Sequence, residues 1–143
     1  MPENLLPSSH RIAFSFPADV TSIAEVRHLI LSEARTLPFS VEELDDIALA
    51  VSEAFTNLVQ HAGDYRIRGV CEINPRQLEV RFEIESSASK HIERTQLPNG
   101  LSVGGRGIPL LHLLIPMVEI RHLADGVTEL RLVKPVSAIQ EEH

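Results

Sequence analysis

The chain has 143 residues, of which 43% are apolar, and this is enough material for one domain with a single hydrophobic core. Its formal net charge is −7, with 20 acidic against 13 basic residues, which argues against direct binding to nucleic acid. The lone Cys71 excludes an internal disulfide, and no apolar run approaches the roughly 20 residues that span a membrane. We therefore expect a cytoplasmic protein with no membrane contact.

The N-terminal half carries one strand pattern and two helix patterns. Apolar and polar residues alternate over 11–16, which predicts a strand with one buried face. Apolar residues then recur at helical spacing, and we expect helices over 20–36 and 41–61. The first helix can be capped by Asp19 or by Thr21.

The second helix has recognisable ends. Ser40 and Glu43 form a capping box, in which each side chain can bond to the backbone N–H of the other residue. Gly63 follows the last turn, where a helix-ending glycine belongs. Apolar residues cover more than half of the helix circumference, so we expect it to be largely buried.

The C-terminal half alternates strand patterns with one short helix. The expected elements are strands at 69–73, 78–84, 118–123 and 128–133 and a helix at 108–114. The aperiodic segment 85–103 is typical of a functional lid. We expect a domain over 11–134, with a loose leader at 1–10 and a tail at 135–143. The segregated order predicts an α+β two-layer sandwich, with a mostly antiparallel mixed sheet and helices on one face.

Three polar side chains follow one another at four-residue spacing in the second helix. Glu53, Asn57 and His61 fall on one helix face, about 6 Å apart along the axis per step. The side-chain carbonyl of Asn57 is the kind of oxygen that Mg²⁺ takes as a ligand. Glu53 can accept a proton from an attacking hydroxyl or water.

A glycine-rich turn precedes the short helix, in the segment GGRGIPLLHLL (104–114). Bare N–H groups at such a turn bind phosphate, with the helix dipole behind them. Arg106 adds a planar donor suited to a terminal phosphate. The turn and the polar helix face together predict a nucleotide site.

Each of these features also has a purely structural reading. Glu53 and Asn57 can form a helix-interior pair bonded to neighbouring backbone. His61 can serve as a partner of the C-terminal helix dipole. The glycines can form a flexible turn, and Arg106 can meet solvent alone.

The segments EAFTNLVQHA (53–62), GGRGIPLLHLL (104–114) and GVTELRLVK (126–134) occur in an order that resembles the histidine-kinase-like ATPase superfamily, or Bergerat fold. The resemblance covers about 11–134 and is greatest to the anti-sigma-factor serine-protein kinases. It implies an ATP-dependent kinase that phosphorylates a serine or threonine of a STAS-domain anti-sigma antagonist. It also implies binding to a sigma factor and a homodimeric state.

The same resemblance implies a role for individual residues. Glu53 would be the catalytic general base and Asn57 the Mg²⁺ ligand. The residues implied to bind ATP are Asn57, His61, Ser86, Gly104, Gly105, Arg106, Gly107, Ile108 and Thr128. Thr128 would lie near the adenine.

The chain departs from this family where a D-x-G-x-G motif is expected. Ser86 stands in place of the aspartate that reads the adenine amino group, and Ala88 and Lys90 stand in place of the glycines. Loss of a charge-assisted hydrogen bond costs about 1.5–3 kcal/mol. Two hypotheses follow: an active kinase, or a degenerate kinase-like module that sequesters a sigma factor or STAS protein without effective use of ATP.

Overall fold

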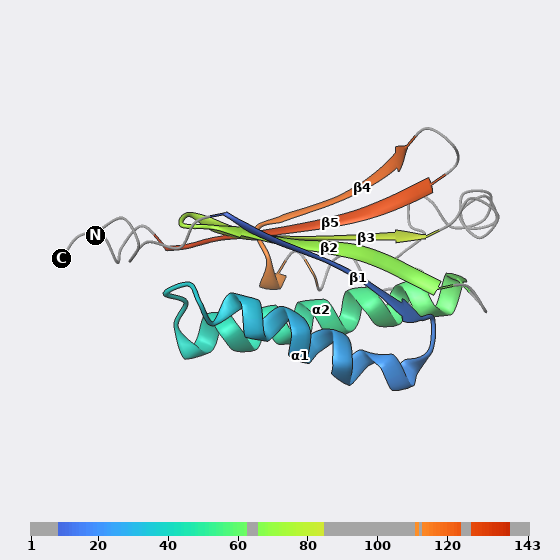
Figure 1. The fold of residues 1–143 in the computed structure, drawn as a ribbon, viewed down its shortest axis with the longest axis horizontal. Helices are drawn as coiled ribbons and strands as arrows, with labels where there is room; N and C mark the ends of the chain where they lie inside the picture. The colour runs from blue at the N-terminus through green and yellow to red at the C-terminus, as the bar shows by residue number, and fades with distance from the viewer. Residues whose placement is uncertain (1–8, 63–65, 85–110, 112, 124–126, 138–143) are drawn as a thin grey trace.

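A computed structural model describes residues 9–62, 66–84, 111, 113–123 and 127–137. Its elements form two layers, with both described α-helices on the same face of one sheet (Figure 1). The helices are α1 (Ile23–Ala34), preceded by the 3-10 turn η2 (Val20–Ser22), and α2 (Val41–Ala62). The strands are β1 (His10–Pro17), β2 (Arg66–Asn74), β3 (Gln77–Ile84), β4 (Met117–Leu123) and β5 (Val127–Pro135).

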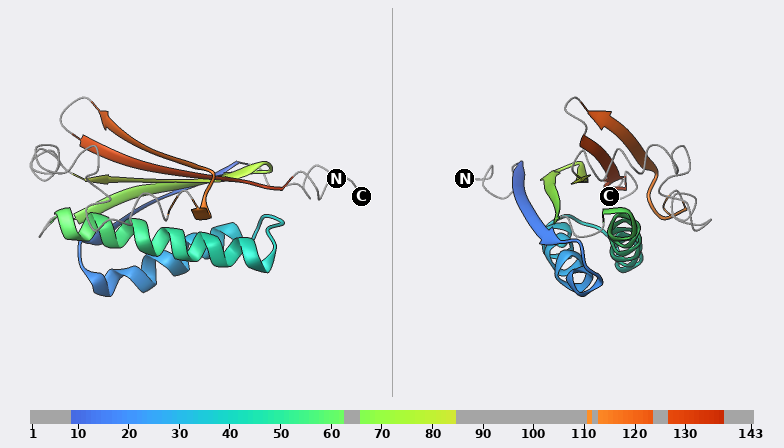
Figure 2. Two further views of the ribbon diagram at one scale, coloured as in Figure 1. Left: turned by 180° about the vertical axis from the view of Figure 1, so that it is seen from behind. Right: turned by 90° about the vertical axis from the view of Figure 1, so that its right-hand side faces the viewer.

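The strands lie in the order β1-β2-β3-β5-β4. Each neighbouring pair of these strands is antiparallel. Viewed end-on, α1 lies beneath the β1 and β2 side of the sheet and α2 beneath the middle strands (Figure 2). The predicted α+β two-layer architecture is therefore confirmed, with a sheet that is antiparallel throughout its described part.

The core lies between the sheet and the helices. Every second residue of β3 is buried, which leaves the intervening charged residues on the opposite face. Three phenylalanines cross the core: Phe14 and Phe82 have ring centroids 5.8 Å apart, and Phe82 and Phe55 have centroids 6.2 Å apart. These edge-on contacts join β1, β3 and α2.

Local signals set the helix starts as expected. The Ser40 N–H donates to Glu43 Oε1 at 2.8 Å, and the Glu43 N–H donates to Ser40 Oγ at 3.0 Å, so the capping box is confirmed. Asp19 rather than Thr21 caps the first helical turn, because its Oδ1 accepts from the Thr21 N–H at 2.8 Å. Gly63 lies outside the described residues.

Two predicted elements differ from the structure in length. The strand predicted at 69–73 begins at Arg66, because Ile67 is buried while Arg66 and Arg68 point outward. Of the helix predicted at 108–114, residues 111, 113 and 114 are described and helical. The Ile115 N–H donates to the Leu111 carbonyl oxygen at 2.8 Å, which closes the last turn of this helix.

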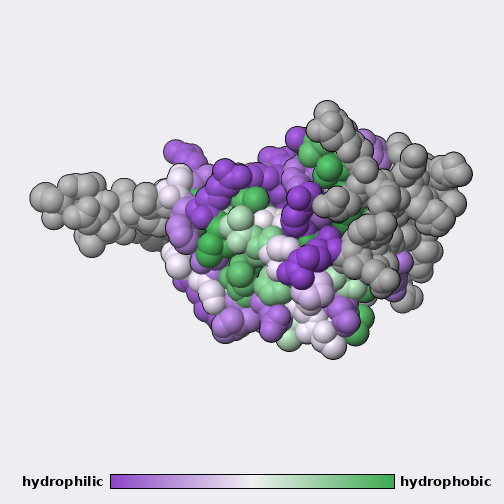
Figure 3. All heavy atoms as spheres, turned by 45° about the vertical axis from the view of Figure 1, so that its right-hand side comes forward, coloured by the Kyte–Doolittle hydropathy of each residue, from purple (hydrophilic) through white to green (hydrophobic). Residues whose placement is uncertain are grey.

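Half-buried apolar residues flank the core at the β1 edge. Ile12 and Phe16 of β1 and Leu29 of α1 pack against it without being covered completely. Figure 3 shows hydrophobic residues gathered between hydrophilic ones on the side of the molecule that carries β1 and α1.

Candidate functional site

The direction of α2 places its polar residues at one end of the layer. Ile47 and Val51 meet Leu78 and Val80 around a small internal gap, and Phe55 contacts Phe82 farther along β3. The helix therefore follows β3 in the same direction. Its C-terminal half lies at the end of the sheet where β3 terminates at Ile84.

Asn57 is buried in this half of α2, with 7% of its surface exposed. Its Nδ2 donates to the backbone carbonyl oxygen of Glu53 at 2.9 Å. This hydrogen bond is the one expected of a helix-interior pair, and it also fixes the amide plane. The side-chain oxygen Oδ1 is not used by the bond, and its hard, neutral character fits a magnesium ligand.

Glu53 is less buried than we expected from the largely apolar helix that carries it. Its side chain is half-buried, because α2 is covered on one face and carries exposed residues such as Leu49 on another. A half-buried carboxylate retains contact with water, so it can exchange a proton with solvent or with a bound hydroxyl. The one-turn separation from Asn57 places its backbone carbonyl in direct contact with the Asn57 amide.

Thr128 lies on β5 and is 3% exposed. It is the register partner of Ile84, and its neighbours along the same face, Leu130 and Leu132, are core residues. Thr128 therefore faces the helix layer at the end of β3, the same end at which the C-terminal half of α2 lies (Figure 1). The structure thus brings Asn57 and Thr128 to the same end of the molecule.

His122 is a residue of this region that the sequence did not single out. It pairs with Thr128 across β4 and β5, and its Nδ1 lies 3.3 Å from Thr128 Oγ1. The predicted strands 118–123 and 128–133 do not by themselves fix this register, because a shift of one residue would place His122 opposite Glu129 instead. The sequence therefore did not show that the His122 ring would meet the Thr128 hydroxyl.

The other predicted nucleotide contacts cannot be placed. The His61 side chain and residues Ser86 and 104–108 lie outside what the structure describes. In the described ranges, no group of three or more His, Cys, Asp and Glu side chains could hold a metal ion. Mg²⁺ often takes only one or two protein oxygens, so such an ion at Asn57 would be completed by phosphate and water oxygens.

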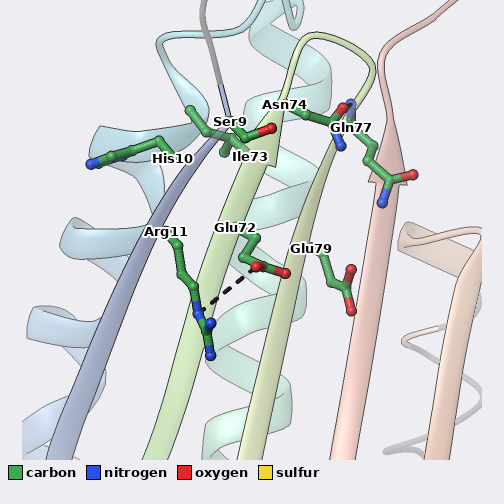
Figure 4. A pocket seen from close by; sticks show the side chains of 8 residues that line it. All are labelled: Ser9, His10, Arg11, Glu72, Ile73, Asn74, Gln77 and Glu79. Atoms are coloured by element: carbon green, nitrogen blue, oxygen red, sulfur yellow. Dashed lines mark hydrogen bonds and ion pairs between the residues drawn. The ribbon is translucent and has the colours of Figure 1, made fainter.

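A hollow of about 180 Å³ lies on the face of the sheet that is turned away from the helices (Figure 4). Its acidic residues are engaged by arginines: Arg81 Nη1 lies 3.0 Å from Glu72 Oε1 and 2.9 Å from Glu79 Oε2. Arg11 Nε lies 3.8 Å from Glu72 Oε2. These paired charges stabilise the outer face, and the sheet separates them from Asn57.

No helix among the described residues is long and apolar enough to cross a membrane.

Residues 16–134 of the chain match the model of a protein family described as "Histidine kinase-like ATPase domain". The serine-protein kinase RsbW of Bacillus velezensis is 28% identical over 130 residues, covering 82% of this chain and 81% of that protein. RsbW of Bacillus cereus strain B4264 is 28% identical over 134 residues, covering 84% and 82%. RsbW of Bacillus mycoides is 24% identical over 138 residues, covering 88% and 86%.

Two solved structures share the fold. The crystal structure of RsbU and RsbW domains from Mycobacterium tuberculosis has a TM-score of 0.59 at 15% identity over 87% of this chain, which spans 32% of that longer chain. The SiaB–SiaC complex from Pseudomonas aeruginosa has a TM-score of 0.50 at 13% identity, covering 87% of this chain and 89% of that chain. At such identities the likeness concerns the fold alone.

Proposed function

Because the chain belongs to the histidine kinase-like ATPase domain family, we propose that it is an ATP-dependent protein serine/threonine kinase and anti-sigma factor. Its substrate would be a serine or threonine of a STAS-domain anti-sigma antagonist in a partner-switching module. The names of the RsbW relatives support the kinase activity.

The observation that carries this proposal is the Glu53–Asn57 pair. The hydrogen bond from Asn57 Nδ2 to the Glu53 carbonyl oxygen orients the amide, so that Oδ1 can serve as the metal ligand. A bound Mg²⁺ would neutralise charge on the phosphates. Glu53, half-buried one turn earlier, would accept the proton of the attacking hydroxyl.

The remaining residues that we propose to contact ATP are inferred from the sequence. Thr128 would meet the adenine, and Arg106 the terminal phosphate. The other residues proposed to bind ATP are His61, Ser86, Gly104, Gly105, Gly107 and Ile108. The glycines would supply backbone N–H groups to the phosphates.

Titration with Mg-ATP tests the binding step. We expect the melting temperature of the wild-type protein to rise by several degrees, because a ligand that binds only the folded state stabilises it. Asn57→Ala should abolish the rise. Glu42→Ala is the matched control, since Glu42 is exposed in the first turn of the same helix.

Transfer to a protein tests the chemical step. Incubation with labelled ATP and a STAS-domain partner should label the partner, and Glu53→Ala should remove this labelling while Mg-ATP still binds. Full transfer by the Glu53→Ala protein would contradict the assignment of the general base.

A binding module without effective use of ATP is the second candidate. It is favoured by Ser86, Ala88 and Lys90, which stand where the family carries an aspartate and two glycines. Absence of any thermal response at millimolar Mg-ATP, together with retained binding to a STAS protein or sigma factor, would support this candidate over the kinase.

The proposed assembly is a cytoplasmic homodimer that also binds a sigma factor. Sedimentation of the purified protein, alone and with a sigma factor, tests both contacts. A protein that sediments as a monomer and does not bind the sigma factor would contradict this part of the proposal.

A further inference from the structure

We propose that His122 is a positioning residue that orients the Thr128 hydroxyl and so makes the site prefer a base with an N–H donor at its polar edge. Adenine offers such a donor in its 6-amino group. The inference rests on the proposed binding of ATP and deepens it, because it names the group that selects the base.

The register of the β4–β5 hairpin decides which side chains lie opposite one another. His122 and Thr128 are Cα partners, as are Ile120 and Leu130 before them. Ile120 packs against the core and Leu130 belongs to it, so this face of the hairpin is turned toward the helices. By strand alternation, His122 and Thr128 lie on that same face.

The two side chains differ in their exposure. Thr128 is 3% exposed, whereas His122 is exposed at the edge of the sheet, since β4 is its last strand. Arg121 and Glu129 are also Cα partners, and they occupy the other face, where Arg121 Nε lies 3.3 Å from Glu129 Oε1. The imidazole of His122 thus contacts Thr128 through Nδ1 and is exposed at the edge of the described sheet.

A hydroxyl has one proton and two lone pairs. If its proton is already donated to a neighbour, it can act toward a ligand only as a hydrogen-bond acceptor. Thr128 Oγ1 lies 3.3 Å from His122 Nδ1. In the ring tautomer with its proton on Nε2, Nδ1 accepts the hydroxyl proton. Thr128 then offers only lone pairs to a ligand, and these require an N–H donor.

The opposite tautomer reverses this preference. If Nδ1 carried the proton, it would donate to Thr128, and the hydroxyl would point its own proton toward the ligand. Such a hydroxyl would meet the ring nitrogen N1, which every purine without a 6-oxo group presents as an acceptor. The 6-amino group would then bring no advantage at Thr128.

The test compares Mg-ATP with the magnesium complex of purine riboside triphosphate, which lacks only the 6-amino group. For the wild-type protein we expect ATP to bind about 3- to 10-fold more tightly, the usual effect of one neutral hydrogen bond. His122→Phe keeps an aromatic ring without nitrogen, and Thr128→Val keeps the shape of threonine without its hydroxyl. Both should reduce the ratio toward one.

Two conservative variants serve as matched controls. His122→Asn keeps a hydrogen-bonding atom near the position of Nδ1, and Thr128→Ser keeps the hydroxyl, so both should retain the preference. The double variant His122→Phe with Thr128→Val should lose no more of it than Thr128→Val alone, because the histidine acts through the threonine. A merely structural role of His122 would change melting temperature and leave the ratio between the two nucleotides untouched.

The outcomes separate this inference from the proposed function. Binding of both nucleotides with a ratio that His122→Phe leaves unchanged would overturn the inference alone, whereas no binding of either by the wild-type protein would overturn the proposed kinase as well. Nitrogen-15 spectra of the His122 ring in the ligand-free protein give a second readout. An unprotonated Nδ1 in the neutral ring is the expected result, and a protonated Nδ1 would refute the proposal.

Discussion

Asn57 Nδ2 donates to the main-chain carbonyl oxygen of Glu53 at 2.9 Å, across one turn of α2. This bond satisfies the amide donor of a residue that is only 7% exposed. The bond uses the amide nitrogen and not the oxygen Oδ1, which is the atom proposed to bind the metal ion. Changes that keep the shape of Asn57 but exchange its nitrogen are therefore informative.

Asn57→Asp replaces the donor nitrogen by a second carboxylate oxygen. The bond to the Glu53 carbonyl is lost and a negative charge is added beside the proposed triphosphate, so we expect Mg-ATP to bind about tenfold more weakly. Calorimetric titration measures this change. Gln60→Glu makes the same change of charge at an exposed position of α2 and should bind nearly as the wild type does. Equal loss in both variants would contradict a specific role for Asn57.

Ser86→Asp restores the carboxylate that the sequence lacks. A charge-assisted hydrogen bond to the adenine amino group would contribute about 1.5–3 kcal/mol, and we expect a rise of about 10- to 150-fold in ATP affinity. Ser87→Asp adds the same charge one residue later in the sequence and serves as the matched control. A gain in both variants, or in neither, would show that position 86 does not read the base.

Ser40→Ala removes the cap of α2. The Glu43 N–H then loses its acceptor, Ser40 Oγ at 3.0 Å, and we expect the free energy of unfolding to fall by about 1 kcal/mol. Urea denaturation followed by circular dichroism measures the loss. Ser32→Ala is the control, because Ser32 is exposed within α1 and should change stability by less than about 0.5 kcal/mol. Equal stability of the two variants would refute the importance of the cap.

Glu79 makes the outer face of the sheet sensitive to acid. Burial acts to raise the pKa of its carboxyl, but the hydrogen bonds and charges of Arg131 and Arg81 outweigh this effect and hold the pKa below its ordinary value of 4.5. Arg131 Nε lies 2.6 Å from Glu79 Oε2. Since the unfolded chain takes up the proton more readily, this stabilisation is present above about pH 4.5 and is lost as the pH falls through the folded-state pKa.

Glu79→Gln tests this dependence. We expect it to lower the free energy of unfolding at neutral pH by about 1.5–3 kcal/mol, the range for a hydrogen bond to a charged group. Its stability should also fall less steeply than that of the wild type below about pH 4.5. Glu42→Gln is the matched control, because it removes a carboxylate that is exposed in α2. Parallel pH profiles for the wild type and Glu79→Gln would rule out the contribution.

Much of the fold followed from residues close together in the chain. Strand alternation, the Ser40–Glu43 box and helical spacing act over two to four residues, and they predicted both helices and the strand order along the chain. Sequence spacing also placed Glu53 one turn before Asn57. It could not show that Glu53 is only half-buried, because burial depends on what the rest of the chain places over α2.

The early start of β2 shows the same limit. Gly69 weakens a strand by its intrinsic preference. In the folded protein the ring of Phe14 lies where its side chain would be, since a Cβ at Gly69 would come 2.4 Å from Phe14 Cζ. Gly69 is therefore explained by its packing against Phe14 of the neighbouring strand β1, although glycine by itself disfavours a strand.

By itself, the sequence determined the class of fold, the capped start of α2 and the presence of an acid and an amide on one helix face. The tertiary structure decided which distant residues meet: His122 with Thr128 in the hairpin, and Glu79 with Arg131, 52 positions later in the chain. The physical reason is that periodicity and capping are short-range effects of the backbone. Contacts across strands and layers arise only when packing of the core fixes the register between them.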